Sequence, residues 1–79
     1  MRAVFVLIKT EPKHTGDVAA RIAEMEQFSE AYSISGQYDI LAKLYVENFD
    51  DLGHLVVDQI QAIPGVRDTF TILTFRAFG

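Results

Sequence analysis

The histidine at position 54 has neighbours at a spacing that can bind a metal ion. Asp50 and Asp58 lie four residues before and after it, so on a helix the three side chains share one face and offer ligands to a divalent cation. At about 100° per residue, however, this column lies opposite the apolar stripe of the same segment, where a helix is normally solvated. We therefore expect an ordinary polar surface here, with no bound metal.

A second candidate is the segment 33–39, Ser-Ile-Ser-Gly-Gln-Tyr-Asp. It combines free backbone donors, two hydroxyl groups and the carboxylate of Asp39. A zwitterionic amino acid needs an acceptor for its ammonium group and several N–H or O–H donors for its carboxylate, and this segment supplies both. A Gly-x-x-Asp turn is also common hairpin chemistry, in which the aspartate accepts from local backbone amides. Spacing alone leaves both interpretations open and favours the turn.

Signals for catalysis are weak throughout the sequence. There is no cysteine, no glycine-rich phosphate loop and no nucleophile beside a base. We therefore predict a protein that is not an enzyme and that uses no cofactor.

Composition indicates one small domain over residues 1–79. Hydrophobic residues make up 49% of the chain, and eleven acidic against seven basic residues give a net charge of -4. Such a charge leaves no basic field for phosphates, which disfavours direct nucleic-acid binding. No apolar stretch approaches the roughly 20 residues of a membrane-spanning helix, and the run 3–8 is too short for a signal peptide. We expect a cytoplasmic protein with no membrane contact.

Hydrophobic periodicity predicts the elements of the first half. Residues 2–10 are apolar on both alternating faces, which is typical of a central strand. A helix is expected over 15–26, with Thr15 as its N-cap. Residues 28–35 and 39–46 then form a β-hairpin.

The second half supplies another helix and another strand. Asn48 can cap a helix whose apolar positions follow the 3.6-residue period, at Leu52, Leu55, Val56, Ile60 and Ile63. Gly53 within it indicates either close packing or simple tolerance. Pro64-Gly65 ends the helix, and a strand is expected over 67–78. The order strand-helix-strand-strand-helix-strand predicts an α+β, ferredoxin-like sandwich, with two helices on one face of a four-stranded antiparallel sheet.

Two short helices cover only one face of such a sheet. The first strand is apolar on both faces, and the last carries Phe70 and Ile72 on one face and Leu73 and Phe75 on the other. An apolar face on the order of several hundred square ångströms is larger than a monomer normally exposes. We expect a second copy to pack on it, giving a dimeric α+β barrel. The alternative is a long last strand that bends over the face within one chain.

Three segments, taken in order, resemble the effector-binding module (RAM domain) of the Lrp/AsnC transcriptional regulators. Residues 3–8 are similar to its first strand, 33–43 to its central hairpin, and 63–66, with Thr69 and Thr71 beyond them, to its last helix-to-strand junction. The resemblance covers essentially the whole chain. Family members carry a helix-turn-helix DNA-binding domain before the module and none precedes it here, so the resemblance implies a stand-alone module.

The resemblance implies regulation rather than catalysis. In the family, the sheets of two chains pack into dimers, dimers associate into octamer- or decamer-like rings, and small effectors, commonly amino acids, bind in clefts between dimers. Carried over, Gly36 allows close backbone approach, Tyr38 lines the cleft and Asp39 accepts from an ammonium group. The full expected ligand-binding set is Ser35, Gly36, Gln37, Tyr38, Asp39, Thr69 and Thr71. Gln37 departs from the acidic residue often found at its position, which leaves the effector open.

The sequence also leaves other partners and functions open. Co-assembly with a full-length Lrp/AsnC regulator would let such a module alter DNA binding. A small dimeric α+β-barrel monooxygenase shares the topology, but such enzymes usually hold His or Asn in a pocket beneath the helices, where this sequence is aliphatic. An amino-acid-binding regulatory domain of the kind attached to biosynthetic enzymes would bind at the turn between the first strand and the first helix.

Overall fold

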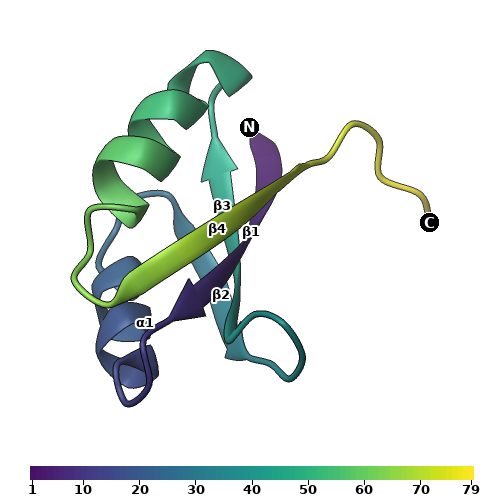
Figure 1. The fold of residues 1–79 in the computed structure, drawn as a ribbon. Coiled ribbons are helices and arrows are strands. Elements are labelled where there is room, and N and C mark those ends of the chain that lie inside the picture. Colours follow the sequence, from purple (N-terminus) through teal and green to yellow (C-terminus); the bar gives the residue numbers. More distant parts are fainter.

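One antiparallel sheet organises the chain, and the computed structural model describes all of residues 1–79 (Figure 1). The strand order is β2-β3-β1-β4, with bounds β1 (Arg2–Thr10), β2 (Phe28–Ser33), β3 (Ile40–Val46) and β4 (Val66–Leu73). Helical segments pack on one face only, and they are α1 (Thr15–Ala23), η1 (Phe49–Asp51) and η2 (Gly53–Ile60). The predicted ferredoxin-like arrangement is confirmed. No helix is long and apolar enough to cross a membrane.

The core lies between the sheet and the helices. Strand β1 pairs with both β3 and β4, and its alternate residues Val4, Val6 and Ile8 are fully buried. Antiparallel partners point to the same face, so their β3 neighbours join them under the helices. The buried side chains that complete this layer come from β3, α1 and η2: Ile40, Ala42, Leu44, Val46, Val18, Ile22, Leu55, Val56 and Ile60.

The first helix differs from its predicted bounds at both ends. Its N-cap is His14, and Thr15 is already the first helical residue, so the prediction of Thr15 as N-cap is wrong. The Thr15 hydroxyl is instead hydrogen-bonded to the Thr10 hydroxyl at 2.7 Å. The helix ends at Ala23 rather than at residue 26, because the Met25 amide donates to Ile22 and starts the turn into β2.

The second helix is wider than an α-helix. Asn48 accepts from the Asp50 amide at 3.0 Å, which confirms the predicted cap, but the cap opens a single 3₁₀ turn, η1. The following η2 is a π-helix, in which the Gln61 amide donates to the carbonyl of Val56 at 2.8 Å. At α-helical spacing Leu55 and Ile60 would lie about 140° apart. Bonding five residues back brings both onto the buried face.

The last strand is shorter than predicted. It ends at Leu73, which pairs with Val4, whereas the sequence pattern extended it to residue 78. Only Arg2 and Ala3 remain on β1 beyond that pair, so the ladder has little left to pair with. The Thr74 hydroxyl donates to the Ala3 carbonyl, and residues 74–79, called the tail below, then leave the sheet.

The sheet surface turned away from the helices is uncovered. We call it the open face, and the register assigns to it the apolar side chains of Phe5, Leu7, Leu41, Phe70 and Ile72, with Glu30, Tyr32, Lys43 and Tyr45 beside them. Phe70 keeps 54% of its surface exposed and Tyr32 55%. Strand β4 does not bend over this face, so the single-chain shielding that the sequence left open does not occur.

A substitution test follows from two glycines, Gly53 at the start of η2 and Gly65 between η2 and β4. Gly65 has a φ of +99°, and a Cβ placed there would lie 2.9 Å from the Cβ of His14. Because both the conformation and the contact are unfavourable, Gly65→Ala should lower the free energy of unfolding by about 1–3 kcal/mol. Urea unfolding followed by circular dichroism, at one fixed chain concentration, measures this.

Gly53 provides the matched control. No atom lies within 4 Å of a Cβ placed there, so this glycine reflects tolerance and not close packing. Gly53→Ala should leave stability unchanged or raise it by up to about 1 kcal/mol. Equal losses in the two variants would contradict the assigned backbone at Gly65.

Candidate functional site

The β2–β3 connection is a closed loop whose ends are fixed to the sheet. The Ile34 amide donates to the Asp39 carbonyl at 3.0 Å, and the Asp39 amide donates to the Ile8 carbonyl at 2.9 Å. Gly36 has a φ of +108°, a conformation that side chains other than glycine rarely adopt. The exposed part of the loop therefore comprises Ser35, Gly36 and Gln37, with Tyr38 and Asp39 half-buried behind them.

The Asp39 carboxylate has a structural role. Its Oδ2 accepts from the backbone amide of Thr10 at 2.8 Å and from the Thr10 hydroxyl at 3.3 Å. Thr10 is buried, and its hydroxyl also bonds to Thr15 at the start of α1. One carboxylate thus joins the hairpin loop, the end of β1 and the first turn of α1. This is the amide-satisfying role that the turn interpretation describes, although the amide is 29 residues away in the sequence.

A small pocket lies against the same loop. It has a volume of about 250 Å³ and is lined by Lys9, Gln37, Tyr38 and Asp68. The Lys9 ammonium donates to the Gln37 carbonyl at 3.1 Å, which holds its positive charge beside the loop. Lys9 and Asp68 are cross-strand partners of β1 and β4, so an ammonium group and a carboxylate flank one cavity. The Tyr38 ring packs on Phe70 with the centroids 6.4 Å apart.

Within one chain, two of the predicted binding residues point elsewhere. Thr69 and Thr71 pair with Ile8 and Val6, which are buried under the helices, so both threonines belong to the helix-side face of β4. The Thr69 hydroxyl accepts from the Gln61 side chain at 2.8 Å. The loop pocket therefore brings together Gln37 and Tyr38 of the predicted set and adds two residues that sequence reasoning missed. Lys9 and Asp68 are oppositely charged, and a correct antiparallel register of the first and last strands would have paired them.

The candidate metal ligands form an exposed pair. His54 Nδ1 lies 2.9 Å from Asp58 Oδ2, and their side chains are 70% and 60% exposed. Asp50 belongs to η1, where its amide is bonded to Asn48. No group of three or more His, Cys, Asp or Glu side chains is placed to hold a metal ion. The histidine column is a polar surface, as its position opposite the buried stripe indicates.

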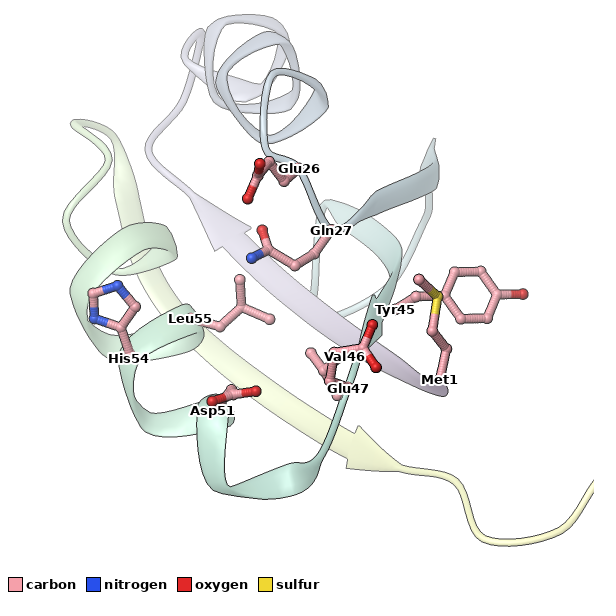
Figure 2. Close-up of a pocket in the computed structure, with 9 residues that line it drawn as sticks. All are labelled: Met1, Glu26, Gln27, Tyr45, Val46, Glu47, Asp51, His54 and Leu55. Carbon is pink, nitrogen blue, oxygen red and sulfur yellow. The ribbon is translucent and has the colours of Figure 1, made fainter.

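A larger pocket lies at the other end of β3 (Figure 2). Its volume is about 390 Å³, and Glu26, Glu47, Asp51 and His54 surround an apolar wall that includes Leu55. None of the residues predicted to bind a ligand lines it. The loop and this pocket flank opposite ends of the seven-residue strand β3, so they are separate features.

Polar side chains interrupt the open face on β2 and β3. The Tyr32 hydroxyl donates to the Glu30 carboxylate, and this hydrogen bond raises the pKa of Tyr32 above its usual value. Lys43 Nζ lies 3.7 Å from Glu30 Oε2 and 5.2 Å from the centre of the Tyr45 ring. Its pKa is also raised, first by hydrogen bonding to Tyr45 and then by the charges of Tyr45 and Glu30. These contacts place a polar border beside the apolar part of the open face.

The sequence and fold match one protein family over nearly their whole length. The model of the Lrp/AsnC ligand binding domain matches residues 3–78. The chain belongs to the Lrp/AsnC ligand-binding domain family. As such a domain it is similar to the HTH-type transcriptional regulator FL11 of Pyrococcus abyssi, with 32% identity over 72 residues that cover 91% of this chain and 47% of that regulator.

Further sequence and structure matches cover the same domain. The regulatory protein AsnC of Escherichia coli is 26% identical over 70 residues, covering 89% of this chain and 46% of AsnC. The chain thus spans about half the length of the curated relatives it matches. Among solved structures, TTHA0845 from Thermus thermophilus superposes with a TM-score of 0.94 at 34% identity, covering 100% of this chain and 99% of that one. The L-Met complex of a Neisseria meningitidis transcriptional regulator shares the fold (TM-score 0.88, 16% identity, 99% and 52% covered).

The hydrogen bonds of Asp39 to Thr10 can be tested by removing the carboxylate. Asp39→Ala leaves the buried Thr10 amide without its acceptor, which should cost about 1–3 kcal/mol of unfolding free energy. Asp68→Ala is the control, because that carboxylate accepts only from the neighbouring Thr69 amide at an exposed site, and the expected change is within about 0.5 kcal/mol. Urea unfolding distinguishes the two, and an Asp39→Ala variant as stable as the parent would remove the structural role assigned to this carboxylate.

Proposed function

We propose that this chain is a non-catalytic regulatory module that binds a small zwitterionic effector, an amino acid or a close relative, at the hairpin loop 35–39. The observation that carries the proposal is the loop pocket with its paired charges. The ammonium group of Lys9 offers a partner for the carboxylate of an amino acid, and Asp68 offers one for its ammonium group. The Neisseria regulator crystallised with L-Met makes free amino acids the first ligands to test.

The remaining predicted residues receive distinct roles in this proposal. Ser35 and Gly36 present exposed donors at the loop surface. Asp39 keeps the loop in position through Thr10. Thr69 and Thr71 stand on the other side of the edge strand β4, where a neighbouring chain can use them. The binding site is therefore proposed to be complete only between assembled chains, in clefts between dimers that associate into rings.

The dimer itself is proposed to form by packing of two open faces. The face joins Phe5, Leu7, Leu41, Phe70 and Ile72 in one apolar area, and nothing within the chain covers it. A chain of 79 residues without a disulfide gains most from burying such a surface. An isologous pair buries the same surface on both subunits. The loop pocket lies at the end of this face that adjoins the hairpin loop.

An enzyme of the monooxygenase type receives no support from the residues under the helices. The layer between sheet and helices is aliphatic, and its one buried polar side chain, Thr10, is engaged with Asp39 and Thr15. His54 is 70% exposed and is paired with Asp58. Regulation is proposed to act through assembly, including co-assembly with a full-length regulator of the family.

Ligand binding is tested by calorimetric titration of the twenty amino acids. At least one should bind, and Lys9→Gln or Asp68→Asn should weaken it by about 10-fold or more, since each removes a charge-assisted bond of about 1.5–3 kcal/mol. Asp58→Asn, which changes an exposed carboxylate far from the loop, should bind as the parent does. Amide shifts in the loop 34–39 support this site, whereas shifts confined to residues 11–15 would favour the biosynthetic-enzyme type of domain. No measurable binding of any of the twenty amino acids would refute the proposed ligand class.

Pairing is tested at two apolar positions of equal exposure. Phe70 and Val57 are each 54% exposed, the first on the open face and the second on the outer side of η2. Phe70→Asp should convert the parent assembly to an 8.9 kDa monomer, because an unpaired charge would be buried in the pair. Val57→Asp should keep the dimer. Sedimentation equilibrium measures both, and a parent protein that remains monomeric at micromolar concentration would overturn the pairing.

A further inference from the structure

The tail carries two exposed aromatic side chains that the fold does not use. Phe75 is 82% exposed and Phe78 84%. Phe75 touches the rim of the molecule edge-on to Phe49, with ring centroids 6.4 Å apart. Beyond it, the Arg76 guanidinium lies 5.0 Å from the centre of the Phe78 ring. Figure 1 shows the tail leaving β4 on the side away from the helices.

A groove separates the tail from the open face. Its volume is about 720 Å³, and its floor includes Ala3 and Phe5. Lys43 and Tyr45 line it on the sheet side, and Thr74, Phe75, Arg76 and Ala77 of the tail itself line it on the other. The floor is apolar and the walls offer an aromatic ring and cationic side chains. Such a groove suits an aromatic side chain. Phe78 of the same chain does not line it.

The length of the tail sets what it can reach. From Thr74 to Phe78 there are four residue-to-residue steps, which span about 13–14 Å when the chain is extended. Two sheets packed face to face are separated by about 10 Å. A tail that leaves on the open side is therefore long enough to cross from its own sheet to the sheet of a facing copy. Two-fold symmetry then gives each groove one tail.

We propose that the tails are exchanged between the two subunits, and that the partner's Phe78 occupies the groove beside Phe5 and Tyr45. The occupant is a second copy of this chain, and the inference rests on the face-to-face pairing proposed above. Exchange covers the apolar groove floor and removes one exposed phenylalanine of each chain, Phe78, from solvent in the same step. Phe78 is then an anchor of the dimer and not a free surface residue.

The chain contains no cysteine, so single cysteines report contacts between subunits. One chain carries Ala77→Cys in the tail and a purification tag, and the other carries Ala3→Cys in the groove floor. After the two are refolded together and oxidised, a mixed disulfide of intermediate mass should form in high yield. The control replaces Ala3→Cys with Ala20→Cys, an exposed position on α1 in the helix layer. A mixed product no more abundant than in the control would overturn the exchange.

A second measurement tests the energetic role of Phe78. Phe78→Ser should raise the dimer dissociation constant about 100-fold or more, because each dimer loses two buried phenylalanine side chains, one from each subunit. Val57→Ser is the control and should leave it unchanged. Because Phe78 is exposed in the single chain, circular dichroism should show an intact fold for both variants.

The outcomes separate the two proposals. A dimer with the parent dissociation constant after Phe78→Ser, and without mixed disulfide, refutes the exchange and leaves the pairing intact. A parent chain that is monomeric at every concentration refutes both.

Discussion

The structure of this small domain depends on a central strand, β1, that is apolar on both sides. One side of β1 is sealed by α1 and η2 over Val4, Val6 and Ile8, whereas the other side presents Phe5 and Leu7 on the open face. The helices have nine and eight residues, which suffices for one layer. No covalent cross-link compensates for the uncovered layer. The proposed pairing on the uncovered side links stability to self-association, since what binds only the folded chain stabilises it.

The same strand connects the open face to the loop. The end of β1 supplies Lys9 to the loop pocket and the Thr10 amide to Asp39, and Leu7 stands two residues earlier on the open face. Effector binding at the loop, as proposed, would therefore act on the strand that forms the centre of the proposed dimer. Coupling of this kind is reciprocal, because any factor by which a ligand strengthens assembly is also the factor by which assembly strengthens ligand binding.

Periodicity predicted most of the fold because each element has one buried face. The strand of residues 2–10, the hairpin and the buried positions of the second helix follow from it. Periodicity fails where a contact with another segment of the chain determines the local structure. The pattern of residues 75–78 predicts strand, yet beyond the Val4–Leu73 pair only Arg2 and Ala3 remain on β1. Thr15 has the chemistry of a cap, but Thr10 engages its hydroxyl. The second helix is a π-helix that buries both Leu55 and Ile60, a placement that a fixed angle of about 100° per residue does not predict.

The site was predictable only in part, for the same reason. The loop and its carboxylate could be found from residue types, whereas the charge pair of Lys9 and Asp68 depends on strand register between segments near opposite ends of the chain. Thr69 and Thr71 lie on the opposite side of β4 from that pair. A cleft that uses both sides of one edge strand cannot close within a single chain. The proposed effector affinity must then rise with chain concentration until the assembly is saturated, since subunit association and ligand binding share one equilibrium.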